Sequence, residues 1–138
     1  MNARRREHAA AYEAGFADLV ACGSLRTPGV VDGHVYHQYV VRSSRRDELA
    51  KALAAAGIET GVYYPSPLHL QPALASLGHR AGAFPVAEAA CREGLALPVH
   101  PWLTTAERAR VIDAVWAVVG GAADPPRDGA RAREQPKA

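Results

Sequence analysis

Long apolar runs are missing from this chain of 138 residues, and their absence limits where the protein can act. No stretch reaches the roughly 18 consecutive apolar residues that a membrane-spanning helix needs. Arg4, Arg5 and Arg6 lie near the N-terminus, but the apolar segment that would follow them in a signal peptide is absent. With 49% hydrophobic and 22% charged residues, the chain has room for one globular domain. We therefore expect a soluble, cytoplasmic protein with no membrane partner.

Cysteine and lysine are both scarce, and each scarcity argues against a kind of site. Cys22 and Cys91 have no second cysteine or histidine at metal-ligand spacing, so we expect two reduced thiols and no metal site. Of the sixteen basic residues, fourteen are arginines, and only Lys51 and Lys137 are lysines. The chain therefore offers very few amines for any chemistry that needs a lysine.

Positive charge is in small excess and is scattered along the chain. The formal net charge is +2, whereas a nucleic-acid footprint needs basic residues gathered on one face. Arg4 to Arg6 is the one tight cluster, and we interpret it as the solvated first turn of a helix rather than a phosphate patch. The charge pattern thus argues against a nucleic-acid partner.

Hydrophobic periodicity and turn residues predict alternating helices and strands, followed by a polar tail. The predicted helices cover 3–22, 44–57, 72–78, 85–94 and 104–120, and the predicted strands cover 35–41, 58–64 and 95–99. This order predicts an α/β (α+β) domain over 1–120, with a three-stranded small sheet covered by helices. The segment 121–138 lacks apolar periodicity, so we expect a disordered tail. A small sheet with exposed edges favours a partner domain or subunit.

Several residues predict where these elements begin and which side chains they bury. We expect Ser44 to cap the helix 44–57, and Thr104 with Glu107 to form a capping box on the last helix. The first helix shows an apolar stripe made of Tyr12, Phe16, Leu19 and Val20. The last helix shows a stripe made of Val111, Ile112, Val115, Val118 and Val119.

The densest group of polar and aromatic side chains follows the end of the predicted strand 58–64. It reads Tyr63-Tyr64-Pro65-Ser66-Pro67-Leu68-His69-Leu70-Gln71-Pro72. Phenols, an imidazole and an amide on a proline-stiffened loop provide donors and acceptors for a polar ligand. On composition alone, the alternative remains that both tyrosines are core or interface aromatics and that His69 is a paired surface histidine.

A second cluster of aromatic and imidazole side chains lies on the predicted strand 35–41. Alternation places His34 on the face of Tyr36 and His37 on the face of Tyr39, so the two imidazoles do not converge on a metal. His37 is a candidate contact for a carboxylate or phosphate. We interpret His79 and His100 as surface residues.

The residues alone assemble no catalytic group. Cys22 and Cys91 have no histidine beside them in sequence, and no pair of carboxylates lies at a strand end. We therefore assign no catalytic residue.

Taken together, these segments carry a resemblance to a known family. The matching runs are His34–Arg42, Arg46–Leu49, Gly57–Gly61, Tyr64–Pro72, Phe84–Glu88 and Leu97–Pro101. In this order and spacing they resemble the C-terminal domain of the DegT/DnrJ/StrS sugar aminotransferases, over about Asn2 to Val119. The resemblance implies the small domain of a fold type I enzyme that uses pyridoxal phosphate (PLP).

The resemblance also implies a reaction and a set of partners. Members of that family are homodimers that transfer an amino group, usually from glutamate, to a keto sugar linked to a nucleotide, with PLP as the electron sink. Their Schiff-base lysine and most cofactor contacts lie in a large N-terminal domain that these residues do not match. Lys51 is near the start of an amphipathic helix and Lys137 is in the expected tail, so neither is expected to form the Schiff base. We expect no cofactor bound by this chain alone.

The resemblance assigns substrate contacts to four residues. The segment from Tyr63 to His69 matches the part of the family that approaches the active-site mouth, and we expect Tyr64, Tyr63, His69 and His37 to bind the nucleotide sugar. The family often has a His-Tyr pair where this chain has Tyr63 and Tyr64. Tyrosine at the first position keeps a hydroxyl for phosphate or sugar but removes a possible positive charge.

Two functions follow as hypotheses. The first is the small domain of a sugar aminotransferase, as a truncated product or as one part of a split enzyme that a separate large domain completes. The second is a stand-alone, non-catalytic binding or interaction module that kept the fold and lost the chemistry. By analogy with the family, we expect the exposed sheet to drive self-association.

Overall fold

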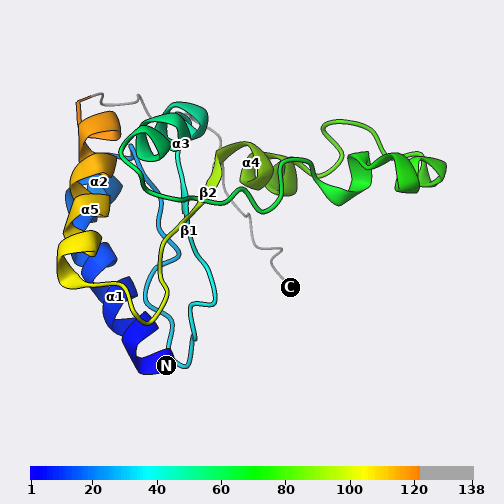
Figure 1. The fold of residues 1–138 in the computed structure, drawn as a ribbon. Coiled ribbons are helices and arrows are strands. Elements are labelled where there is room, and N and C mark those ends of the chain that lie inside the picture. Colours follow the sequence, from blue (N-terminus) through cyan, green and yellow to red (C-terminus); the bar gives the residue numbers. More distant parts are fainter. Residues whose placement is uncertain (122–138) are drawn as a thin grey trace, which may run out of the picture.

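A computed structural model describes residues 1–121 (Figure 1). In chain order the elements are α1 (Asn2–Gly15), α2 (Ala17–Ala21), β1 (Tyr39–Arg42), α3 (Arg46–Ala55), the 3₁₀ helices η1 (Leu68–Leu70) and η2 (Pro72–Leu77), α4 (Pro85–Glu93), β2 (Gly94–Leu97) and α5 (Thr105–Val119). The expected tail, 121–138, lies outside the described residues apart from Gly121, so the domain boundary stays a prediction. No helix within the described range is both long and apolar enough to cross a lipid bilayer.

The sheet has two strands, which corrects the expectation of three. β1 and β2 pair antiparallel, with Tyr39 opposite Leu97 and Arg42 opposite Gly94. The predicted strand 58–64 shrinks to a single bridge in which Gly61 and Ala96 exchange both backbone hydrogen bonds (3.1 and 2.7 Å). Pro98 follows β2 at once and has no N–H to continue a ladder, which limits the third strand to this one residue.

Helices pack around this small sheet and enclose the core. In Figure 1, α1 and α5 run side by side, and α3 packs against α5 and β2. The largest fully buried side chains come from both strands, from helices α1, α2, α3 and α5, and from the segments that join them: Tyr12, Phe16, Leu19, Leu25, Tyr39, Val41, Leu49, Leu53, Leu95, Val115 and Val119. The stripe predicted for the last helix is confirmed, since Val111, Val115 and Val119 are buried and Ile112 and Val118 pack against the core.

The first predicted helix is interrupted at Phe16, which separates α1 from α2. At the end of α1 the carbonyl of Gly15 accepts a hydrogen bond from Trp116 Nε1 (2.8 Å). A Cβ at Gly15 would lie 2.8 Å from Ile112 Cδ1, so a larger residue here would require the Ile112 side chain to shift. Val20 is exposed rather than part of the predicted stripe, because the interruption changes the helical phase beyond Phe16.

The two predicted helix caps have different outcomes. The capping box on α5 is confirmed: Thr104 Oγ1 accepts from the Glu107 N–H (3.2 Å), and Glu107 Oε2 accepts from the Thr104 N–H (2.8 Å). The cap expected from Ser44 is wrong, because α3 begins after Arg45. Ser43 Oγ instead accepts the Arg45 N–H (3.2 Å) and donates to the Ser24 carbonyl (3.2 Å).

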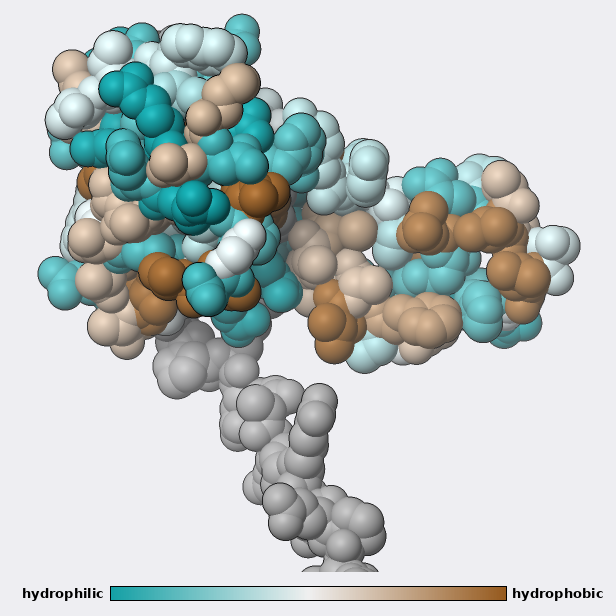
Figure 2. All heavy atoms as spheres, turned by 90° about the horizontal axis from the view of Figure 1, so that it is seen from below, coloured by the Kyte–Doolittle hydropathy of each residue, from teal (hydrophilic) through white to brown (hydrophobic). Residues whose placement is uncertain are grey.

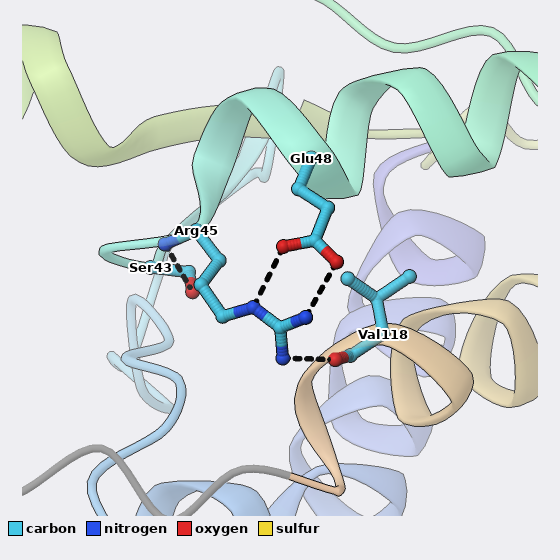
Figure 3. Close-up of polar contacts among 4 residues, drawn as sticks. All are labelled: Ser43, Arg45, Glu48 and Val118. Carbon is cyan, nitrogen blue, oxygen red and sulfur yellow. Dashed lines mark hydrogen bonds and ion pairs between the residues drawn. The ribbon is translucent and has the colours of Figure 1, made fainter.

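Arg45 joins the beginning of α3 to the end of α5 (Figure 3). Its Nε donates to Glu48 Oε2 at 2.8 Å, and a second nitrogen of the guanidinium meets the other carboxylate oxygen at 2.5 Å. A third nitrogen donates to the carbonyl of Val118, one of the carbonyls that a helix end leaves without a partner. The bonds from Arg45 hold the pKa of Glu48 below its ordinary value.

A long arm, defined as residues 65–84, leaves this body and returns to it through α4. Figure 1 shows the arm, with η1 and η2, extending away from the sheet and the other helices. The short helix predicted at 72–78 is confirmed as η2, which ends at Gly78 with a left-handed φ of 72°. His69 is the one buried residue of η1, and η2 has none. The arm therefore has no core of its own.

Candidate ligand-binding site

Two clefts meet at Tyr63, on the side of the body from which the arm departs. The larger, about 620 Å³, has a mostly apolar wall; we call it the apolar cleft, and its lining includes Tyr63, Tyr64, Pro67, His69, Phe84 and Ala87. The smaller, about 300 Å³, has a more polar wall; we call it the polar cleft, and its lining includes Arg5, His37, Gln38, Glu59, Tyr63 and His100. Tyr63 belongs to both walls, so one ligand can reach both clefts.

The ring of Tyr63 is held by the backbone beneath it. A Cβ at Gly61 would lie 2.4 to 2.7 Å from the outer atoms of that ring, so the ring packs directly on the glycine. Gly61 is fixed in turn by its two hydrogen bonds to Ala96 of β2. The Tyr64 ring meets the Tyr63 ring edge-on, with centroids 6.2 Å apart and planes at 82°.

Both tyrosines present their rings to solvent. Tyr63 is 54% exposed and Tyr64 is 72% exposed, so the reading of these residues as core aromatics is wrong. Large aromatic side chains left in water beside a cleft are typical of binding surfaces. Their hydroxyls are available to donate to a ligand oxygen.

His69 is buried, which corrects the alternative of a surface histidine. Its Nε2 lies 2.9 Å from Glu88 Oε1 on α4, and its ring centroid lies 4.8 Å from that of Phe84. The Glu88 carboxylate also accepts the N–H of Gly82 (2.8 and 3.0 Å) and of Phe84 (3.3 Å). Glu88 therefore ties the outgoing and returning limbs of the arm together beside the apolar cleft.

The electrostatics of this pairing favour an ionised Glu88. Burial raises the pKa of the carboxyl, but the hydrogen bonds from Gly82, Phe84 and His69 outweigh burial and place the pKa below its ordinary value. The carboxylate thus keeps its acceptor oxygens at neutral pH.

His37 lies in the polar cleft, on an exposed loop before β1 rather than inside a strand. The strand predicted from Val35 begins only at Tyr39, because Tyr36 has a left-handed φ of 45°. Tyr36 is buried, with its hydroxyl donating to the Gly29 carbonyl (2.9 Å) and its N–H donating to His34 Nδ1 (2.9 Å). The predicted strict alternation of faces over 35–41 is therefore wrong.

The structure brings the four predicted contacts together in two groups. Tyr63, Tyr64 and His69 line the apolar cleft, and His37 and Tyr63 line the polar cleft. The two histidines predicted to be surface residues, His79 and His100, are exposed. In the described part of the chain, no three His, Cys, Asp or Glu side chains are placed to hold a metal ion.

Sequence reasoning missed Arg5 and Glu88. Arg5 is not simply solvated: it is half-buried and lines the polar cleft. Arg5 precedes the buried residues His8 and Tyr12 by three and seven positions, which places it on the inward face of α1. This helical spacing could have indicated its burial from the sequence. Glu88 lies within the family-like run Phe84–Glu88, but no local pattern indicates its bonds to the arm.

The comparisons with known proteins agree on one family. The family model of the DegT/DnrJ/EryC1/StrS aminotransferases matches residues 1–116. A pleiotropic regulatory protein of Geobacillus stearothermophilus is 47% identical over 81% of this chain and 30% of its own length. The dTDP-3-amino-3,4,6-trideoxy-alpha-D-glucose transaminase of Streptomyces venezuelae is 44% identical over 84% of this chain and 31% of its own.

A solved structure gives the same result for the fold. The crystal structure of S. venezuelae DesV in complex with a ketimine intermediate aligns with a TM-score of 0.77 and 40% identity, over 85% of this chain and 32% of that one. Other solved aminotransferases that the chain resembles hold PLP or its amine form, PMP. The chain spans about a third of the length of these relatives. By its sequence and its fold, the chain belongs to the DegT/DnrJ/EryC1/StrS aminotransferase family.

Proposed function

We propose that these residues form the substrate-binding small domain of an aminotransferase acting on a nucleotide-linked keto sugar. The observation that carries the proposal is the pair of exposed tyrosine rings on the wall of the apolar cleft, of which Tyr63 also lines the polar cleft. Relatives named as transaminases of dTDP-linked and UDP-linked sugars support this substrate class. A nucleotide sugar joins a flat base to charged phosphates and a polar ring, and the two clefts offer surfaces of both kinds.

The chain's own residues supply binding rather than bond making. The Tyr63 and Tyr64 rings give flat surfaces for a base or sugar, and their hydroxyls donate to phosphate or sugar oxygens. The bonds of Glu88 to His69, Gly82 and Phe84 fix the wall against which the ligand lies. A wall held in place before binding loses less entropy when the ligand arrives.

PLP, when bound in such enzymes, supplies the electron sink for amino transfer. The described residues do not fit a Schiff-base site: Lys51 is exposed on α3, and no lysine lines either cleft. Lys137 lies outside the described residues. We therefore place the Schiff-base lysine in another part of the aminotransferase, and we propose that residues 1–121 alone do not transaminate.

The exposed apolar residues of the arm are a reason to include a protein partner in this proposal. Leu68 and Leu77 on the arm, and Val86 at the adjoining start of α4, are between 62% and 77% exposed, and Figure 2 shows apolar side chains gathered along the arm. Apolar side chains grouped on a projecting segment favour burial against another protein surface. We propose that the large domain of the aminotransferase, or a second subunit, covers them.

Titration of the 138-residue chain with dTDP-glucose tests the binding role. Tyr64→Ala removes a ring from the apolar cleft and is expected to weaken binding about tenfold. Trp102→Ala is the matched control, because Trp102 is 70% exposed and lines neither cleft. Saturable binding that depends on Tyr64 but not on Trp102 supports the proposal. No binding of dTDP-glucose or of UDP-N-acetylglucosamine, or equal effects of both substitutions, favours the non-catalytic interaction module instead.

A further inference from the structure

The guanidinium of Arg5 lies on the wall of the polar cleft with an unmet bonding need. Its Nε is buried and has no hydrogen-bond partner. Within residues 1–121, no carboxylate lies close enough to form an ion pair with Arg5. Buried polar groups in proteins are nearly always hydrogen-bonded, so an arginine on a cleft wall with an unpaired N–H is a candidate to bind a group that arrives from outside.

Cationic side chains surround this position. Arg4 donates to the Pro101 carbonyl (3.4 Å), and Arg108 meets His8 Nδ1 at 3.1 Å. Burial, then the charges of Arg108 and Arg4, lower the pKa of His8, as does nearby His100. The region around the N-terminal end of α1 therefore disfavours further positive charge and attracts negative charge.

Carboxylates oppose this positive field. Glu59 lines the polar cleft, Glu7 acts to raise the pKa of His8 against the arginines, and Glu107 lies near His100, which acts to lower the pKa of that carboxyl. Arg5 is the one arginine among the residues that line the polar cleft itself.

The other residues that line the polar cleft can form hydrogen bonds with an oxyanion and with the hydroxyl groups of an adjoining sugar. His37 and His100 offer ring N–H donors, Gln38 offers an amide, and Thr60 offers a hydroxyl. Glu59 can accept from a sugar hydroxyl. The volume of about 300 Å³ is at the small end for ligand sites, enough for a phosphate group with part of a sugar.

From this geometry, we infer that the polar cleft is an oxyanion subsite in which Arg5 binds a phosphate or carboxylate group of the ligand. The inference rests on the proposed function, because Tyr63 connects this cleft to the apolar one that would hold the rest of the nucleotide sugar. An oxyanion that reaches the Arg5 guanidinium would gain a charge-assisted hydrogen bond. The phosphate of the nucleotide sugar and the carboxylate of the amino donor are the two sources of such a group.

Nuclear magnetic resonance titrations of the labelled 138-residue chain distinguish these sources. The probes are inorganic phosphate, dTDP and glutamate at low ionic strength, each added to the wild type and to Arg5→Gln. We expect phosphate and dTDP to shift the amide signals of Thr60, Gly61 and Val99, and the substitution to weaken their binding about tenfold. Shifts caused by glutamate alone identify the carboxylate as the natural group and retain the subsite.

Arg6→Gln is the matched control, since Arg6 is exposed on the same helix and lines neither cleft. We expect it to bind phosphate like the wild type. Arg5→Lys keeps a charge in the cleft and should recover part of the lost affinity, which separates ligand binding from a folding defect. Absence of any oxyanion-dependent shift in the wild type, or equal binding by the Arg5→Gln and Arg6→Gln variants, overturns the inference.

The same variants separate this inference from the proposed function. If Tyr64→Ala weakens dTDP-glucose binding but Arg5→Gln changes the binding of neither dTDP-glucose nor glutamate, the oxyanion subsite fails and the substrate-binding role stands. If neither substitution changes the affinity for dTDP-glucose and Arg5→Gln does not change that for glutamate, both ideas fail.

Discussion

His69 on the arm and Glu88 on α4 form a nearly buried pair, with Nε2 and Oε1 2.9 Å apart. The same carboxylate accepts the backbone N–H of Gly82 and Phe84. One side chain therefore connects three points of a segment that has almost no buried residue. The position of the apolar cleft's wall depends on this carboxylate more than on apolar packing.

Glu88→Gln should loosen the arm and leave the body intact. The carboxamide keeps one acceptor oxygen and turns an NH₂ group toward N–H donors, so bonds to Gly82 or Phe84 are lost. Hydrogen exchange at these two amides should become about tenfold faster, with the core amides of α5 unchanged. Asp113→Asn, on the exposed face of α5, serves as the control. Unchanged exchange at Gly82 and Phe84 would show that the carboxylate does not hold the arm.

Gly61→Ala should displace the Tyr63 ring. The new Cβ would lie 2.4 Å from the ring, and Gly61 is tied to Ala96, so the ring is the part that moves. Affinity for dTDP-glucose should fall by about the same factor as in Tyr63→Ala, roughly tenfold. Gly121→Ala is the control, since a Cβ there meets nothing within 4 Å. Wild-type affinity in Gly61→Ala would remove Tyr63 from the site.

Tyr12→Phe should destabilise the body by about 1 kcal/mol, measured by denaturant unfolding. The Tyr12 hydroxyl donates to the Pro98 carbonyl at 2.8 Å and the ring is fully buried, so its removal leaves an acceptor unpaired. Tyr64→Phe makes the same chemical change on a ring that is 72% exposed, and it should alter stability by less than about 0.5 kcal/mol. Equal effects of the two substitutions would contradict the hydrogen bond to Pro98.

His8 should make stability fall as the pH drops below 6.5. Burial and the charges of Arg108 and Arg4 place the pKa of His8 below its ordinary value of 6.5 in the folded state. The unfolded chain therefore takes up a proton first, so this contribution is present above pH 6.5 and is lost between 6.5 and the lower folded pKa. Denaturant midpoints should fall less over this range in His8→Gln than in the wild type. His79→Gln, on the exposed arm, should keep the wild-type slope, and identical slopes in all three proteins would refute the shift.

Periodicity and caps predicted most of the helices because these signals are local. The capping box of Thr104 and Glu107 fixed the start of α5, and the proline and glycine at the ends of η2 fixed its length. The predicted cap at Ser44 was wrong because the sequence alone does not distinguish Ser43 from Ser44. Only the distant carbonyl of Ser24 selects Ser43 as the serine that supports α3.

The third strand and the site were harder to predict because long-range packing decides them. The run from Ile58 to Tyr64 has strand-forming residues, but its partner strand β2 ends at Leu97, just before Pro98, and the pairing is a single bridge. The loop of Tyr63, Tyr64 and His69 was predictable as a polar cluster, while the burial of His69 depends on Glu88, nineteen residues away. The place of Arg5 in the site could not be predicted, because the polar cleft beside the inward face of α1 forms only in the folded chain.

We propose above all that this domain holds a nucleotide sugar between its two clefts, around Tyr63. Isotope-filtered nuclear Overhauser contacts between unlabelled dTDP-glucose and the labelled 138-residue chain test this binding most directly. We expect contacts from the ligand's base or sugar protons to the ring protons of Tyr63 and Tyr64. Contacts confined to another surface, such as the exposed side of α3 around Lys51, with both tyrosine rings silent, would contradict it.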